Sequence, residues 1–298
     1  MKKVFVVIVT YKGKQWYDKC FTSLRESAMP VETIVVDNSP TDEDAEYIKT
    51  HYPEIHLIKT KENLGFGKAN NLGMRYALDH GGDYVFLLNQ DTWIDPDAIE
   101  KLVAIAEKHP EYGIVSPMQM NAKKDGLFML IGVQQDNIRL ISDLYTKHVK
   151  EIYETNYVNA AAWLIPRKVL MEVGGFTPIF QQYAEDDDYI NRVLYHQYKI
   201  GVCPNIEIVH DHQVSFSGAV YKKNVNSHKA FAEWLDINKQ FSPWRLYKLF
   251  VRRWIKGLIL GDSESRLYYA YLIRLLNQRQ GEVLKMRKEN MQKQCSWL

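Results

Sequence analysis

The sequence predicts an α/β protein in which helices cover a mostly parallel sheet, followed by a helical C-terminal segment. Short β-branched runs alternate with segments of helical period through the first half of the chain. Beyond about residue 220 the helical period continues without clear strand runs. Of the 298 residues, 46% are hydrophobic and 25% are charged, a composition typical of a globular protein that buries a core.

The strands of the first half are predicted from short apolar runs with helix-length spacings between them. These runs are 4–9, 33–36, 55–58 and 84–88, and the helical segments between and after them are 15–27, 41–51, 66–80 and 96–109. The last helix opens with Asp95-Pro96, an N-cap followed by proline in the first turn. This order predicts a nucleotide-binding type of parallel sheet.

The alternation decays after Gly113. Strand candidates lie at 112–118, 128–141 and 157–165, a helical run lies at 189–198, and the segment 200–209 is rich in apolar residues. This pattern predicts a mixed or antiparallel extension of the sheet, which we expect to hold the acceptor of any transfer reaction. The predicted domains are residues 1–220 and a helical extension at 221–298.

Charge and cysteine content exclude several classes of protein. Lys and Arg number 38 against 36 Asp and Glu, so the net charge of +2 gives no reason to expect nucleic acid as a partner. Cys20, Cys203 and Cys295 are far apart and lack CxxC spacing, which indicates neither a disulfide framework nor a zinc site. A reducing cytoplasm is therefore the predicted location.

The start of the chain is basic and then apolar, as in a signal peptide. The apolar run at 4–9 is short, and Tyr11-Lys12-Gly13-Lys14 stands where a small-residue cleavage site is expected. We interpret this run as a buried first strand. No stretch approaches the roughly 20 apolar residues of a transmembrane helix.

Polar residues follow each predicted strand of the first half. They are Thr10-Tyr11, Asp37-Asn38-Ser39, Asn63-Leu64-Gly65-Phe66-Gly67 and Asn89-Gln90-Asp91. Ligands of open α/β sheets bind beyond the carboxyl ends of the strands, so these residues offer hydrogen bonds for a base and ribose. Asp37, Asn38 and Asn63 are equally typical of turns and caps, and that interpretation stays open.

A metal site is predicted from Asp91 and His210. Asp91 follows the apolar strand at 84–88, where a divalent ion could bridge its carboxylate to a diphosphate. His210-Asp211-His212 follows the apolar-rich segment 200–209, and imidazole nitrogen suits a transition ion such as manganese. A lone histidine is more often structural, so His210 draws its significance from the other features.

Four consecutive acids, Glu185-Asp186-Asp187-Asp188, precede the helical run at 189–198. Acids at a helix start favour the macrodipole, and capping alone is one interpretation. Four in succession exceed what capping needs. Crowded carboxylates repel one another, which raises the pKa of one of them toward that of a working base.

Taken in order, these motifs resemble those of the family 2 glycosyltransferases with the GT-A fold, particularly bacterial rhamnosyltransferase-like members acting on surface polysaccharides. The resemblance rests on Val9-Thr10-Tyr11, Val36-Asp37-Asn38-Ser39, the segment from Asn63 to Asn71, Leu87 to Thr92, Glu185 to Asp188 and His210. An ordered set spanning residues 4 to about 212 is far more specific than any one motif. It implies a GT-A domain over residues 1–220.

The resemblance also implies residue roles. The donor would be bound by Thr10, Tyr11, Asp37, Asn38, Asn63, Gly65, Asn70, Asn71, Asn89 and Gln90, and the acceptor by Trp163, Glu185 and Asp188. Asp186 would be the catalytic base. Related enzymes often carry an acid where this chain has Gln90, so Mn²⁺ or Mg²⁺ would bind chiefly to Asp91, with His210 as second ligand. Trp163 would offer a stacking surface, unless it is a core residue.

The implied activity is inverting, metal-dependent transfer of a sugar from a nucleotide diphosphate donor, dTDP-rhamnose or a UDP-hexose. The acceptor would be a hydroxyl of a glycan or a lipid-linked saccharide in surface polysaccharide biosynthesis. One alternative, motivated by Gln90, is a degenerate transferase acting as a scaffold. Another is a sugar-phosphate nucleotidyltransferase, which needs a glycine-rich basic loop after the first strand, whereas residues 10–14 hold a single glycine.

The segment from Phe250 to Ile259 combines apolar, aromatic and basic residues, as interfacial helices do. It predicts peripheral contact with the inner face of the membrane, where a lipid-linked acceptor would lie. Packing of the same residues against the core is the alternative. The oligomeric state is not predicted.

Overall fold

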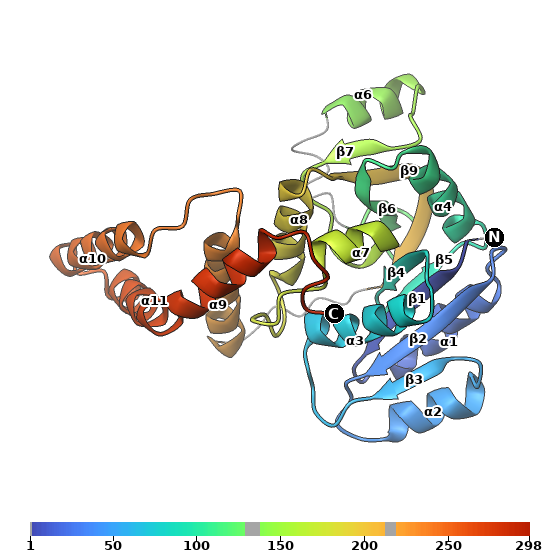
Figure 1. Ribbon diagram of the computed structural model, residues 1–298, viewed down its shortest axis with the longest axis horizontal. Helices are drawn as coiled ribbons and strands as arrows, with labels where there is room; N and C mark the ends of the chain where they lie inside the picture. Colours follow the sequence, from blue (N-terminus) through green and yellow to red (C-terminus); the bar gives the residue numbers. More distant parts are fainter. Residues whose placement is uncertain (1, 129–137, 212–218) are drawn as a thin grey trace.

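The computed structural model describes residues 2–128, 138–211 and 219–298, with side chains throughout except at 219–226. A central sheet of nine strands has helices on both faces, and three C-terminal helices form a lobe beside it (Figure 1). None of the helices within these ranges has the length and apolar content that crossing a bilayer requires.

The predicted parallel half of the sheet is confirmed. The strands are β1 Val4–Thr10, β2 Val31–Asp37, β3 His56–Lys59, β4 Tyr84–Leu88, β5 Thr92–Ile94, β6 Tyr112–Met120, β7 Tyr153–Thr155, β8 Ala162–Pro166 and β9 Lys199–His210. Their order is β3-β2-β1-β4-β8-β6-β9-β5, with β7 pairing to β9. The first four are parallel, and antiparallel pairs at β4–β8, β6–β8, β5–β9 and β7–β9 make the second half mixed, as predicted.

The helices lie on both sides of this sheet. They are α1 Lys14–Arg25, α2 Glu43–His51, α3 Phe66–Asp79, α4 Ala98–Lys108, α6 Ile138–Thr146, α7 Arg167–Val173, α8 Glu185–Tyr195, α9 Ala219–Leu235, α10 Pro243–Ile259 and α11 Ser263–Asn290. Because side chains alternate along a strand, β1 supplies Val4, Val6 and Ile8 to one core and Phe5 and Val7 to the other.

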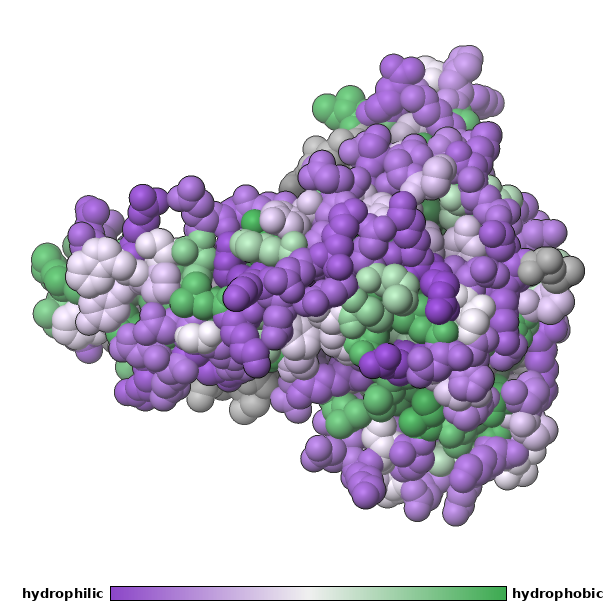
Figure 2. Space-filling model, viewed as in Figure 1, coloured by the Kyte–Doolittle hydropathy of each residue, from purple (hydrophilic) through white to green (hydrophobic). Residues whose placement is uncertain are grey.

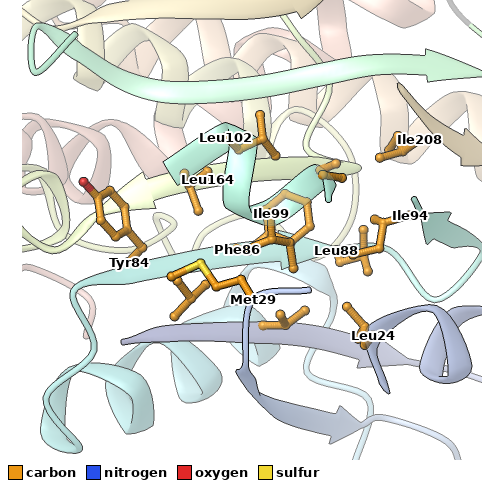
Figure 3. Packing of buried hydrophobic residues seen from close by; sticks show 14 of the residues in the cluster. Leu24, Met29, Tyr84, Phe86, Leu88, Ile94, Ile99, Leu102, Leu164 and Ile208 are labelled. Atoms are coloured by element: carbon orange, nitrogen blue, oxygen red, sulfur yellow. The ribbon is translucent and has the colours of Figure 1, made fainter. Parts of the chain in front are cut away.

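The first core lies between the sheet and helices α1 and α4. Figure 3 shows Phe86 and Leu88 of β4 packed among Leu24 of α1 and Ile99 and Leu102 of α4. The second core lies on the opposite face, under α3, α7 and α8. Apolar residues on both faces explain why the parallel strands read as continuous hydrophobic runs.

Several predicted boundaries were wrong. Of the strand expected at 128–141, residues 129–137 lie outside the described ranges, and Ile138 begins helix α6. The strand expected at 157–165 begins at Ala162. Helix α4 begins at Ala98 with Asp97 as its N-cap residue, because the Asp95 carbonyl accepts the Ala98 N–H in a preceding turn.

The C-terminal helices form a lobe in which α10 and α11 pack against each other and α11 packs on α9. Figure 1 shows α10 and the first turns of α11 projecting away from the sheet. The segment after α11 returns to the sheet domain, where Gly175 N–H donates to the Ser296 carbonyl at 2.8 Å. The predicted domain boundary at 220/221 falls in the first turn of α9 and stays a prediction.

Candidate active site

The polar rim lies where the strand order reverses, between β1 and β4. The side-chain amide of Gln90 spans this point: its Oε1 accepts the Tyr11 N–H at 2.9 Å, and its Nε2 donates to the Tyr11 carbonyl at 3.3 Å. A Cβ at Gly13 would lie 2.1 Å from Gln90 Oε1, so a side chain there would displace the Gln90 amide. Gln90 therefore fixes the loop after β1 to the loop after β4.

The adjacent Asp37 is enclosed. Its Oδ1 accepts hydrogen bonds from the Thr10 hydroxyl and the Ser39 N–H, and its Oδ2 lies 2.9 Å from Lys59 Nζ. Thr10 and Asp37 are both 0% exposed. The polar groups of these two side chains join the ends of β1, β2 and β3, and their direct contact with the donor stays a prediction.

The segment from Asn63 to Gly65 is held by buried polar contacts. Asn38 Nδ2 donates to the Gly65 carbonyl at 3.1 Å, and Asn63 Oδ1 accepts the Gly65 N–H at 2.8 Å. Gly65 has φ +79°, and a Cβ there would lie 1.9 Å from the Gln181 carbonyl oxygen. Asn38 and Gly65 thus position this loop against the segment before α8, whereas Asn63 is exposed. The contacts of these residues with the donor stay predictions.

Two asparagines of α3 are also structural in this conformation. Asn71 Nδ2 donates to the Phe176 carbonyl at 2.8 Å, and its Oδ1 accepts the Phe176 N–H at 2.7 Å. Asn70 Nδ2 donates to the Phe66 carbonyl within the same helix. Both side chains are buried. Asn71 joins α3 to the chain that leads into α8, and the contact of both asparagines with the donor stays a prediction.

Asp91 and His210 converge, as predicted. Thr92 pairs with His210 in the antiparallel β5–β9 ladder, and the Asp211 N–H donates to the Asp91 carbonyl at 2.8 Å. This register places His210 Nε2 3.4 Å from Asp91 Oδ1, with both residues buried. His212 lies outside the described residues.

A chain of contacts connects this pair to the acidic helix. His210 Nδ1 lies 3.1 Å from Gln119 Oε1, and Gln119 Nε2 donates to Asn159 Oδ1. The backbone of the next residue, Ala160, hydrogen-bonds to Asp186 and lowers its pKa. Asp91, His210 and Asp186 therefore belong to one connected region of the protein.

Asn89 lies in the same region. Its N–H donates to the Ala161 carbonyl at 2.9 Å, and its own carbonyl accepts from the Thr92 N–H. These bonds place the start of the 89–91 loop beside the residues that lead into β8. The predicted contact of Asn89 with a donor is untested.

Asp186 is half-buried in the first turn of α8 and accepts a 2.7 Å hydrogen bond from the Tyr157 hydroxyl at Oδ2. Burial raises the pKa of Asp186 above its ordinary value, while the Tyr157 bond partly opposes that rise. A carboxylate with a raised pKa is a stronger base. These are the properties of a proton acceptor at a working pH.

The chain enters α8 through two strained residues. Tyr183 has φ +74° and Ala184 has φ +69°, in the left-handed region that favours glycine. Such strain is common where surrounding structure fixes a functional group. The next residue, Glu185, is buried, and burial together with the Asp186 charge raises its pKa to about 8. Glu185 is thus largely uncharged at neutral pH and lies beside the base.

Two predicted acceptor residues are buried. Asp188 is enclosed, accepting from the Thr177 hydroxyl at 2.7 Å and pairing with Arg192 Nε at 3.0 Å. Trp163 is 0% exposed between Phe176 and Tyr189 in the second core. Both side chains are enclosed in this conformation, and their contacts with an acceptor stay predictions.

A model of the family described as "Glycosyl transferase family 2" matches residues 5–174. The chain belongs to the family 2 glycosyltransferases. This transferase is 26% identical over 70% of its length to the low-salt glycan biosynthesis hexosyltransferase Agl10 of Haloferax volcanii, covering 67% of that protein. It is 23% identical over 70% of its length to the dTDP-rhamnosyl transferase RfbF of Shigella flexneri, covering 68%.

A third relative is the N-acetylglucosaminyl-diphospho-decaprenol L-rhamnosyltransferase of Mycobacterium tuberculosis, 24% identical over 69% of this chain and 75% of that protein. Among solved structures, a fragment of S. aureus TarS in complex with UDP-GlcNAc superposes with a TM-score of 0.56 at 15% identity, covering 79% of this chain and 66% of the fragment. The GT-A fold predicted for this family 2 glycosyltransferase is confirmed.

A metal would have few ligands from this transferase. Among the described residues, no group of three or more His, Cys, Asp and Glu side chains is placed to hold an ion. Two atoms that each lie about 2.1 Å from one ion are at most about 4.2 Å apart, and the 3.4 Å between Asp91 and His210 satisfies that limit. The pair fits an ion that takes its remaining ligands from a diphosphate and water.

The prediction from sequence missed Tyr157 and Gln119. Gln119 is buried near the end of β6 and Tyr157 is half-buried ahead of β8, and nothing local in the sequence distinguishes them from other polar positions. Their roles arise from contacts across 29 residues to Asp186 and 91 residues to His210. No pattern along the chain could have identified them.

Proposed function

We propose that this family 2 glycosyltransferase is an inverting enzyme that moves a sugar from a nucleotide diphosphate to an acceptor hydroxyl. The observation that carries the proposal is the Tyr157–Asp186 pair: a carboxylate with a raised pKa, held at a helix start and connected to Asp91 and His210. Asp186 is the base. The names of the relatives support transfer of a rhamnosyl or other hexosyl group, and the donor we propose is dTDP-rhamnose or a UDP-hexose.

The reaction is a single displacement. The carboxylate of Asp186 takes the proton from the acceptor hydroxyl as its oxygen forms a bond to the anomeric carbon. The bond from that carbon to the diphosphate breaks on the opposite face, and the diphosphate leaves with the electron pair, so the configuration inverts. The transition state resembles an oxocarbenium ion, as in glycoside hydrolysis.

The residues of the chain divide the remaining tasks. Uncharged Glu185 can donate a hydrogen bond next to the base, and the exposed Tyr11 and Asn63 face the nucleotide. Mn²⁺ or Mg²⁺ held by Asp91 and His210 would stabilise charge on the leaving diphosphate. The acceptor is a glycan or a lipid-linked saccharide of a surface polysaccharide, modified on the cytoplasmic side of the membrane.

The test is the Asp186→Asn variant, which keeps the size of the side chain and removes the base. We expect transfer to fall by about 10²–10⁴-fold, the usual contribution of general base catalysis, while donor binding measured by calorimetry is unchanged. Asp187→Asn, which alters the exposed neighbouring acid, is the matched control. Near-normal turnover of Asp186→Asn would show that another group is the base.

A catalytically degenerate scaffold is the competing function, and Gln90 motivates it, since its amide serves the Tyr11 backbone. The release of nucleotide diphosphate from the donor, measured without acceptor, distinguishes the two proposals. An enzyme of this class slowly hydrolyses the donor when no acceptor is present, whereas a scaffold releases no nucleotide diphosphate.

A further inference from the structure

Helix α10 carries three stripes of different chemistry. A helix turns by about 100° per residue, so residues three or four apart share a face. The inner stripe, Leu246, Phe250 and Gly257, packs on the rest of the C-terminal lobe. The apolar stripe is Trp244, Tyr247, Val251, Ile255 and Leu258, and the basic stripe is Arg245, Lys248, Arg252 and Lys256. Within the part of the chain that the structure describes, the two residues of α10 that are buried, Phe250 and Gly257, both belong to this inner stripe.

The apolar stripe is open to solvent. Trp244 is 64% exposed, Ile255 44% and Leu258 51%. The stripe continues to Ile259 at the end of α10 and to Leu260 in the turn that follows, which are 78% and 67% exposed. Figure 2 shows hydrophobic residues gathered at this outer end of the lobe. Contiguous apolar surface of this kind marks an interaction site, since isolated exposed residues are normal but runs of them are not.

The charge of α10 is of one sign. The helix contains five Lys and Arg residues and no Asp or Glu. Lys248 Nζ lies 4.9 Å from the centre of the Trp244 ring, which stacks with Tyr247 at 6.3 Å. Aromatic rings beside cations suit the boundary between lipid headgroups and acyl chains, where one side is apolar and the other is negatively charged.

We propose that α10 and the α10–α11 turn bind the surface of a membrane containing anionic phospholipid. The apolar stripe enters the headgroup region, and the basic stripe faces lipid phosphates. A second copy of the chain fits less well, because a symmetric interface brings the same patch from both partners together and would oppose its cations to one another. A negatively charged lipid surface complements them.

The bound lobe would hold the catalytic helix at the membrane. Phe180 and Ala184 belong to the segment that leads into Glu185, and they pack in the same hydrophobic cluster as residues of α9, α10 and α11. In addition, His228 of α9 hydrogen-bonds to the Gln182 carbonyl. A lipid surface occupied by α10 is thereby connected through packed side chains to the start of α8. The binding step needs neither donor nor acceptor, so it stands apart from the proposed transfer reaction.

The experiment is flotation of the full chain with vesicles of phosphatidylcholine alone and of phosphatidylcholine mixed with phosphatidylglycerol. We expect association with the mixed vesicles only, weakened at high salt. The triple variant Lys248→Gln, Arg252→Gln, Lys256→Gln should reduce the partition coefficient by on the order of a hundredfold. The variant Ile259→Ser, Leu260→Ser should reduce the partition coefficient more than tenfold, because this double substitution removes the two most exposed aliphatic side chains of the apolar stripe.

The matched control removes three exposed cations elsewhere, Lys49→Gln, Lys123→Gln and Lys168→Gln, and should bind as the parent does. All variants should retain the parent's melting temperature and release nucleotide from the donor in solution at the parent's rate. No flotation of the parent with anionic vesicles, or equal loss in both triple variants, overturns the proposal. So does a parent dimer in solution that the Ile259→Ser, Leu260→Ser variant dissociates while vesicle binding persists.

Discussion

The hydroxyl of Tyr157 lies 2.7 Å from Oδ2 of Asp186 and stabilises its charged form, although burial holds the pKa of this carboxylate above its ordinary value. The two effects act in opposite directions on one group. Tyr157 therefore sets how far the pKa of the proposed base rises, and its hydroxyl is also positioned by the segment that leads into β8.

Removing that hydroxyl should move the pH dependence of transfer. In Tyr157→Phe the carboxylate loses a stabilising bond, its pKa rises further, and the acid limb of kcat/KM shifts to higher pH. A hydrogen bond to a charged group contributes about 1.5–3 kcal/mol, which corresponds to about one to two pH units. Tyr153→Phe removes a similar Tyr–Asp bond, to Asp143, away from the site and should leave the profile unchanged. An unshifted limb in Tyr157→Phe would contradict the pairing.

Glu185 should make the protein less stable as pH rises. Its pKa is about 8 in the folded protein and 4.5 ordinarily, so between these values the unfolded chain releases a proton that the folded protein keeps, and stability falls. Glu185→Gln removes this loss. We expect the variant to melt higher than the parent at pH 8, by about 2–4 °C per kcal/mol, and to show little difference near pH 4.5. A difference independent of pH would exclude titration of Glu185 as the cause.

Gly65 should tolerate no side chain. Gly65→Ala adds a Cβ that would lie 1.9 Å from the Gln181 carbonyl at φ +79°, so both strain and collision oppose it. Gly81→Ala is the matched control, since Gly81 has φ +78° with nothing within 4 Å. By chemical denaturation we expect Gly81→Ala to cost about 1–2 kcal/mol and Gly65→Ala more than about 3 kcal/mol. Equal costs would mean that the loop moves away freely.

Chelation should suppress transfer if Asp91 and His210 hold an ion. Mn²⁺ binding, followed by electron paramagnetic resonance with nucleotide diphosphate present, should weaken at least tenfold in Asp91→Asn and in His210→Gln. His109→Gln breaks a histidine–carboxylate pair with Glu151 elsewhere and serves as control. Full activity in metal-free buffer would remove both residues from this role.

The helices and strands of the parallel half could be predicted because each is encoded locally. The run at 4–9 is apolar on both faces of the sheet, and the period changes at the helices that follow. β5 and β7 escaped prediction because three residues are too few to show a period. Their existence depends on pairing with β9, far away in sequence.

The site shows the same division between local and distant information. Sequence alone identified Asp91, His210 and the four acids at 185–188, since acids and imidazoles after apolar strands and at a helix start stand out along the chain. The family resemblance chose Asp186 among the four acids. Burial decided the rest: Trp163 and Asp188 have the residue types of a binding surface but lie inside the protein. Exposure depends on what packs over a side chain, which no local pattern records.

The sequence by itself determined the alternation of strands and helices in the parallel half, the family motifs and the candidate acids, because propensity, hydrophobic period and residue type are properties of short segments. Only the tertiary structure decided that Gln119, Asn159 and Tyr157 connect those acids, and that α10 has an apolar stripe with no partner in the described chain. Hydrogen bonds and burial are formed between segments that the fold brings together, so they exist only once the chain has packed.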